Sequence, residues 1–172
     1  MNRRKFLNLV GGCCCSLLLP NCSTNEVTQR KQLILYPEPF INKQSELFYK
    51  NFLRRSKLSK DKNKISMMNN IAKRLIDNVN EYFIRIKKPN PTLDFKWEYN
   101  LIEDKQVNAF CAPGGKIAVY TGILEYTKNK DGLAAVMGHE VAHAVAKHSA
   151  ERMSRTIAVE MGFGVADVFT GG

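Results

Sequence analysis

Residues 139–143, with the sequence His139-Glu140-Val141-Ala142-His143, constrain the fold of this chain more than any other segment. The two histidines are four residues apart, and side chains at that spacing lie on one face of an α-helix, about one turn apart. Both imidazoles can therefore reach a single metal ion if the segment is helical. Apolar residues recur through the surrounding sequence, which predicts a helix that Asp131 caps and that continues to about Arg155.

The residue types in this segment suit a zinc site. Zinc binds neutral imidazole nitrogens at about 2.0–2.1 Å, so we predict one zinc ion held by His139 and His143. Glu140 follows the first histidine, and its carboxylate can face a water molecule at the metal without binding the metal itself. We predict that Glu140 is the catalytic base, which takes a proton from that water and delivers it to the leaving amine of a peptide. Two histidines on a helix can also be satisfied by hydrogen bonds alone, and that alternative stays open.

The third histidine of the chain, His148, lies five residues beyond His143. On a continuous helix with about 100° per residue, its side chain would point about 140° away from that of His143. We therefore expect His148 to make a surface or core contact and not to bind the metal.

Hydrophobic periodicity in the rest of the chain predicts one α+β domain. The predicted elements are helices over residues 43–55 and 66–86 and strands over residues 95–101, 107–111 and 116–121. The last two strands flank the turn Ala112-Pro113-Gly114-Gly115 and are expected to form a hairpin. Residues 56–64 are rich in lysine and are expected to be a mobile linker. The pattern predicts a mostly helical domain with a small antiparallel sheet.

Residues 1–22 are typical of an export signal, because a basic head precedes an apolar run that is too short to span a membrane. Arg3 and Arg4 resemble a twin-arginine signal. Residues 18–22 resemble a lipobox, in which Cys22 would be acylated. We expect a bacterial cell-envelope or periplasmic protein, anchored as a lipoprotein through Cys22, with the polar residues 23–31 as a tether.

The cysteines and the net charge add two further expectations. Four of the five cysteines lie within residues 1–22, and the remaining one, Cys111, cannot form an internal disulfide by itself. We expect it to be a buried structural thiol. The formal net charge of +10 is compatible with an anionic partner, but no nucleic-acid-binding motif accompanies it. We expect a basic solvated surface, a protein or peptide substrate and no nucleic-acid partner.

Longer stretches around these motifs resemble one known family. Residues 108–122 (NAFCAPGGKIAVYTG), 133–143 (LAAVMGHEVAH) and 148–154 (HSAERMS) are similar to the HtpX/Oma-type zinc metallopeptidases of peptidase family M48, including their periplasmic lipoprotein members. The resemblance implies a gluzincin-type zinc metalloendopeptidase with an α+β, zincin-like fold and a small sheet beside the active-site helix. It also implies hydrolysis of misfolded envelope proteins in a cleft lined by the strand near residues 116–121, to whose edge a substrate strand would add.

One part of the family's pattern is not matched. The family's third zinc ligand is a glutamate on a later helix, within a Glu-x-x-x-Ala-Asp segment, whereas the carboxylates after His143 are Glu151, Glu160 and Asp167. Glu151 would lie about 12 Å along the same predicted helix, too far to share the metal. Glu160 is a weak candidate, and Asp167 has no glutamate at the expected offset. We expect the metallopeptidase domain, residues 65–172, to be incomplete at its C-terminus.

Two functions of different class follow from this departure. One is an active zinc metalloendopeptidase that is completed by an unusual ligand or by a partner. The other is a truncated, catalytically inactive relative, such as a split-gene fragment or a lipoprotein that acts as a binding module. The natural substrate and the oligomeric state do not follow from the residues.

Overall fold

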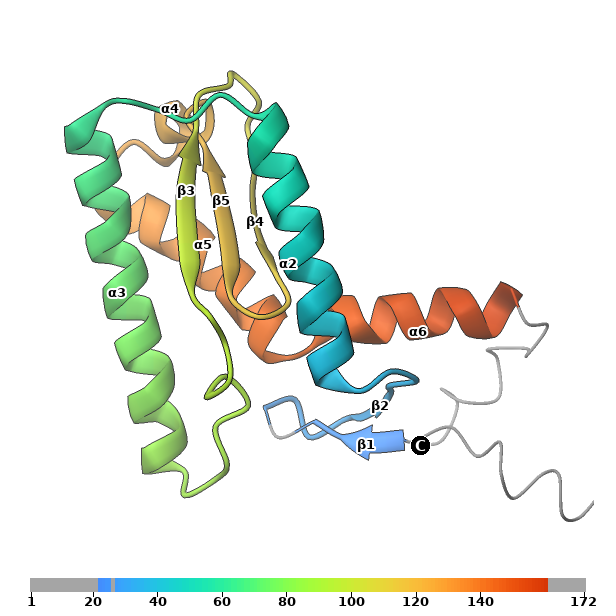
Figure 1. The fold of residues 1–172 in the computed structure, drawn as a ribbon. Coiled ribbons are helices and arrows are strands. Elements are labelled where there is room, and N and C mark those ends of the chain that lie inside the picture. The colour runs from blue at the N-terminus through green and yellow to red at the C-terminus, as the bar shows by residue number, and fades with distance from the viewer. Residues whose placement is uncertain (1–21, 26, 161–172) are drawn as a thin grey trace, which may run out of the picture.

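A computed structural model describes residues 22–25 and 27–160, with only the backbone described for residues 22, 23 and 158–160. Its elements, labelled as in Figure 1, are β1 (Cys22–Thr24), β2 (Lys31–Leu33), α2 (Glu38–Arg55), α3 (Lys62–Arg85), β3 (Glu98–Ile102), β4 (Ala109–Ala112), β5 (Lys116–Tyr120), α4 (Ile123–Thr127), α5 (Lys130–Val145) and α6 (His148–Glu160). The expected signal at residues 1–21 and the carboxylate of Asp167 lie outside the described residues.

The central sheet has the strand order β3-β5-β4. β4 and β5 pair in antiparallel fashion around the turn at Gly114 and Gly115, which confirms the expected hairpin. β3 is parallel to β5, so the sheet is mixed and not purely antiparallel. β5 is therefore the central strand, and the expectation that residues 116–121 offer a free edge to a substrate is wrong. β3 and β4 are the two edge strands, and the segment at residues 57–59 bonds to the outer side of β3. Within the described residues, the free edge therefore belongs to β4.

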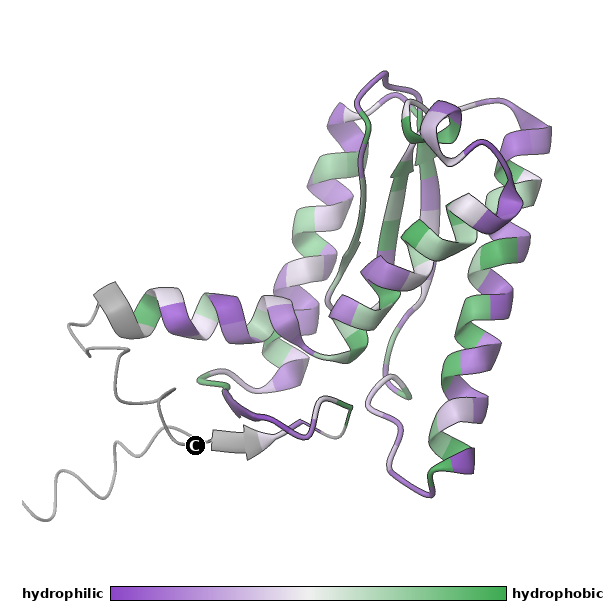
Figure 2. Ribbon diagram, turned by 180° about the vertical axis from the view of Figure 1, so that it is seen from behind, coloured by the Kyte–Doolittle hydropathy of each residue, from purple (hydrophilic) through white to green (hydrophobic). Residues whose placement is uncertain are grey.

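Helices cover both faces of this sheet. α2 packs on one face, and α3 and α5 pack on the other; Figure 2 shows α5 crossing that second face. The alternation of side chains along β5 explains this layering, because Ile117 and Val119 join the core beneath α3 and α5 whereas Ala118 and Tyr120 join the cluster beneath α2. The α+β fold class is thus confirmed.

The first two long helices begin earlier than the periodicity predicts. α2 begins at Glu38, where Pro39 is tolerated in the first helical turn. α3 begins at Lys62 because the carboxylate of Asp61 accepts hydrogen bonds from the first free amides of the helix. The residues between the helices are not a mobile linker: the Ser59 amide donates to the Leu101 carbonyl at 2.8 Å and attaches this segment to β3.

The single helix expected from Asp131 to about Arg155 is two helices. Asn129, not Asp131, caps α5, and its side chain accepts a hydrogen bond from the Gly132 amide at 2.9 Å. α5 ends at Val145, and Lys147 adopts a left-handed conformation with φ of 56° that turns the chain into α6. The sequence contains no glycine or proline at this break, so the usual signals of a helix end are missing.

The segment expected to be a polar tether packs against the domain. β1 and β2 form an antiparallel pair, and the side chains of Asn25 and Gln32 are buried against the end of α5. Among the helices of the described part of the chain, none is both long enough and apolar enough to cross a membrane.

Candidate metal centre

The candidate site lies on α5, whose orientation is fixed by its buried face. Leu133, Met137 and Val141 recur every four residues and pack into the main core, with Leu133 and Met137 fully buried. This packing leaves His139 exposed and His143 half-buried on another side of the same helix. The expected helical placement of the two histidines is therefore confirmed.

The two imidazoles converge on one point. Their Nε2 atoms are 2.9 Å apart, and the rings meet edge to face with centroids 4.4 Å apart. Two nitrogens that bind one tetrahedral zinc ion at 2.0–2.1 Å would be about 3.3 Å apart. The pair is therefore arranged almost as a metal would hold it, and imidazole nitrogens are donors that suit zinc.

Glu140 is half-buried on α5, the helix that packs against β4. Burial, and in second place the charge of Glu140, raises the pKa of the Cys111 thiol to about 12, so the carboxylate lies close to this strand. Cys111 itself is a free, buried thiol, as the sequence predicts. Glu140 therefore lies near enough to β4 for its charge to affect a buried residue of that strand.

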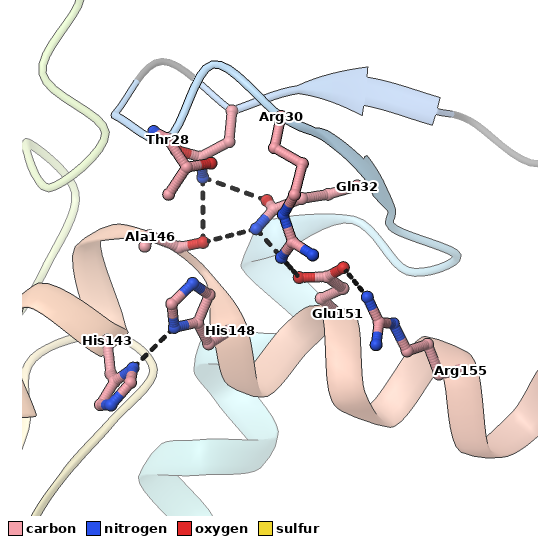
Figure 3. Close-up of polar contacts among 9 residues, drawn as sticks. Thr28, Arg30, Gln32, His143, Ala146, His148, Glu151 and Arg155 are labelled. Atoms are coloured by element: carbon pink, nitrogen blue, oxygen red, sulfur yellow. Dashed lines mark hydrogen bonds and ion pairs between the residues drawn. The ribbon is translucent and has the colours of Figure 1, made fainter. Parts of the chain in front are cut away.

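His148 is the residue whose position the sequence mispredicts. Because the chain turns at Lys147, the side chain of His148 comes back towards α5, and its Nδ1 lies 2.6 Å from the Nδ1 of His143 (Figure 3). Burial, with a smaller effect of the neighbouring His143, lowers the pKa of His148 below its usual value. A neutral ring at this place can accept a hydrogen bond from His143.

No third ligand accompanies the histidine pair: within the described residues, no group of three or more His, Cys, Asp or Glu side chains is arranged to hold a metal. Glu151 was expected on the same helix as the histidines, but it lies on α6. Its carboxylate forms ion pairs with Arg30 and Arg155. Glu160 ends α6 about 18 Å of helix away from His148, which places it out of reach of the same metal.

An apolar hollow of about 380 Å³ runs beside β4, between α2 and the start of α6. Phe48, Phe110 and Met153 are among the residues that line it, and Phe48 is 59% exposed. Cys111, whose pKa responds to the charge of Glu140, also lines this hollow.

A histidine pair and a glutamate on one helix, beside the free edge of a small mixed sheet, define the class of metallopeptidases. Comparison with known proteins gives the family: the model of "Peptidase family M48" matches residues 69–171, and the chain belongs to this family. The HtpX/Oma-type resemblance is thereby confirmed.

Several known proteins are similar to this chain. The mitochondrial metalloendopeptidase OMA1 of Schizosaccharomyces pombe is 56% identical over 66 residues, which are 38% of this chain and 20% of that protein. OMA1 of Saccharomyces cerevisiae is 29% identical over 160 residues, or 88% of this chain and 45% of that protein. The β-barrel assembly-enhancing protease of Yersinia pestis is 29% identical over 86 residues, or 50% of this chain and 15% of that protein. The matched segments span less than half the length of each of these relatives.

The expected location is contradicted by these relatives. Similar proteins from two yeasts, a plant and two mammals are all named as mitochondrial. The expectation of a lipoprotein in the bacterial envelope or periplasm is therefore wrong. It rested on residues 1–22, of which only the backbone of Cys22 is described.

Proposed function

We propose that this chain acts as a zinc-dependent metalloendopeptidase in which His139 and His143 hold the metal and Glu140 is the general base. The observation that carries the proposal is the approach of the two Nε2 atoms to 2.9 Å on the accessible side of α5. When bound, zinc supplies a Lewis acid that polarises a peptide carbonyl and acidifies a water molecule.

The carboxylate of Glu140 performs the proton transfers of this reaction. Because Glu140 follows His139 directly, it lies beside the metal ligands without being one of them. It removes a proton from the attacking water and passes it to the leaving amine, so the hydrolysis needs no covalent intermediate with the protein.

The substrate is proposed to lie along the free edge of β4. An extended peptide can pair there through backbone hydrogen bonds and place an apolar side chain in the hollow lined by Phe48, Phe110 and Met153. Recognition through backbone groups gives loose sequence preference. An unfolded protein segment, which is extended and exposes apolar side chains, is therefore the substrate class that fits this edge.

Zinc stoichiometry and casein cleavage test the proposal on the full chain. The wild type is expected to bind about one zinc ion and to cleave casein. His139→Ala should lose the zinc, whereas Glu140→Gln should keep it and lose cleavage. Glu125→Gln, an exposed glutamate on α4, is the matched control and should behave as the wild type.

Two results would separate the competing functions. If the wild type and Glu140→Gln are equally inert, the chain is not a protease, and the inactive relative becomes the better description. If His139→Ala binds zinc as the wild type does, the metal centre is not at the histidine pair.

A further inference from the structure

The corner between α5 and α6 contains a contact that the proposed chemistry does not use. It joins Nδ1 of His143 to Nδ1 of His148 at 2.6 Å (Figure 3). The other ring nitrogen of His143, Nε2, faces His139. We propose that His148 is a positioning residue, which fixes the ring orientation and the protonated nitrogen of the zinc ligand His143. This inference rests on the proposed function, because it concerns the ligand role of His143.

The hydrogen bonds around His143 can run in only two consistent directions, since each neutral imidazole has one donor and one acceptor nitrogen. In one direction, His148 donates to Nδ1 of His143, and His143 then carries its proton on Nε2. In the other, His143 donates from Nδ1 to His148, and its Nε2 carries a lone pair on the side that faces His139. Only the second direction lets Nε2 of His143 bind a metal, so His148 acts as the acceptor that selects it.

The contact depends on the break between the helices. If α5 continued through residue 148, the His148 side chain would point about 140° away from that of His143. At the left-handed Lys147 the chain turns out of the direction of α5, and the Lys147 amide donates to the Ala144 carbonyl at 3.1 Å. The side chain of Lys147 forms an ion pair with Glu38 at the start of α2. The turn that carries His148 is thus held by its own backbone and by a neighbouring helix.

The N-terminal hairpin, formed by β1 and β2, hydrogen-bonds to the same corner between α5 and α6. The carbonyl of Ala146, a buried residue just after α5, accepts hydrogen bonds from Asn25 Nδ2 at 2.9 Å and from Gln32 Nε2 at 2.8 Å (Figure 3). Both side chains are buried, so these bonds are shielded from competition with water. The hairpin therefore caps the end of the helix that carries the metal ligands.

Glu151 connects the hairpin to α6. Its side chain is 4% exposed, and its oxygens accept from Arg30 at 2.7 Å, from Arg155 at 2.6 Å and from Gln32 at 3.1 Å (Figure 3). A buried carboxylate with this many partners is held in one orientation. Since Glu151 lies one helical turn beyond His148 on α6, the same bonds fix the start of α6 and the direction of His148.

Zinc affinity, measured on the full chain by competition with a chromophoric chelator, tests the assignment. His148→Leu removes the acceptor and is expected to weaken zinc binding about 10- to 100-fold, the usual effect of losing a group that orients a metal ligand. His148→Asn keeps an acceptor oxygen close to the position of Nδ1 and should restore most of the affinity. Thermal unfolding of both variants monitors the fold separately.

A second measurement needs only the wild type. Nitrogen-15 spectra of the imidazoles in the metal-free protein at about pH 8 report which ring nitrogen carries the proton. We expect the proton of His143 on Nδ1. A proton on Nε2, or a His148→Leu variant that binds zinc as tightly as the wild type, would overturn the inference. If the wild type and His139→Ala bind zinc equally, the proposed metal centre at the histidine pair is refuted. That result differs from one in which only the positioning role of His148 is refuted.

Discussion

Replacing Gln32 by methionine tests whether the N-terminal hairpin is part of the folded domain. Gln32 is 1% exposed, and the change keeps the length of its side chain but removes the amide group. Three hydrogen bonds disappear: donations to the Ala146 carbonyl at 2.8 Å and to Glu151 at 3.1 Å, and one accepted from Asn25 at 3.0 Å. Each partner keeps another hydrogen bond, so no buried group is left without one.

The expected cost follows from these three bonds. With about 1 kcal/mol for each bond between neutral groups and somewhat more for the bond to the carboxylate, Gln32→Met should lower the free energy of unfolding by about 3 kcal/mol. For a chain of this size, that loss corresponds to a fall in Tm of about 6–12 °C.

Guanidinium denaturation of the full chain measures the change in the free energy of unfolding. Gln44→Met, an exposed glutamine on α2, is the matched control and should change stability by less than about 0.5 kcal/mol. If Gln32→Met costs no more than Gln44→Met, residues 23–31 are only a tether, and the proposed support of the α5–α6 corner is wrong.

Two further predictions concern the sheet. Gly115→Ala should destabilise the protein by more than about 2 kcal/mol, because φ is +81° and the new Cβ would lie 2.7 Å from Trp97. Gly114→Ala should cost only about 1–2 kcal/mol, because its φ of +76° is similar but its nearest contact is at 3.4 Å. Equal midpoints of the two variants in urea denaturation would contradict this reasoning. Burial raises the pKa of Cys111 from 9.0 to about 12, so the stabilisation from the protonated thiol is complete below pH 9 and is lost as the pH rises towards 12. Between pH 9 and 11, the free energy of unfolding should therefore fall by about 2–3 kcal/mol more for the wild type than for Cys111→Ala, and parallel pH profiles would argue against a buried thiol.

The sequence predicts the elements whose signal is local. The hairpin of β4 and β5 is marked by the glycine turn and alternating side chains, and α5 by its cap and its apolar residues. The parallel pairing of β3 with β5 is not predictable in this way, since it depends on the long crossover between the two strands. For the same reason, periodicity does not reveal that β5 is the central strand.

The candidate site is predicted only in part. The spacing of His139 and His143 is sufficient to place both on one side of a helix, while their metal-binding role stays a prediction. The predicted position of His148 is wrong because a left-handed lysine, Lys147, is an unusual residue at a helix end. No glycine in the sequence indicates that the helix ends there. The buried roles of Asn25 and Gln32 are missed because polar residues in short strands resemble a loop until their distant partners are known.

The corner that holds His148 also dictates an order of folding. Gln32 and Ala146 are 114 residues apart, and Arg30 and Glu151 are 121 residues apart. The hairpin leaves the ribosome first, but its partners are made only after both long helices and the sheet. Closing so long a loop is entropically costly, so the corner forms after the local contacts of α3, α5 and the β4–β5 hairpin. A force applied to the N-terminus would reverse this order and release the corner before the core opens.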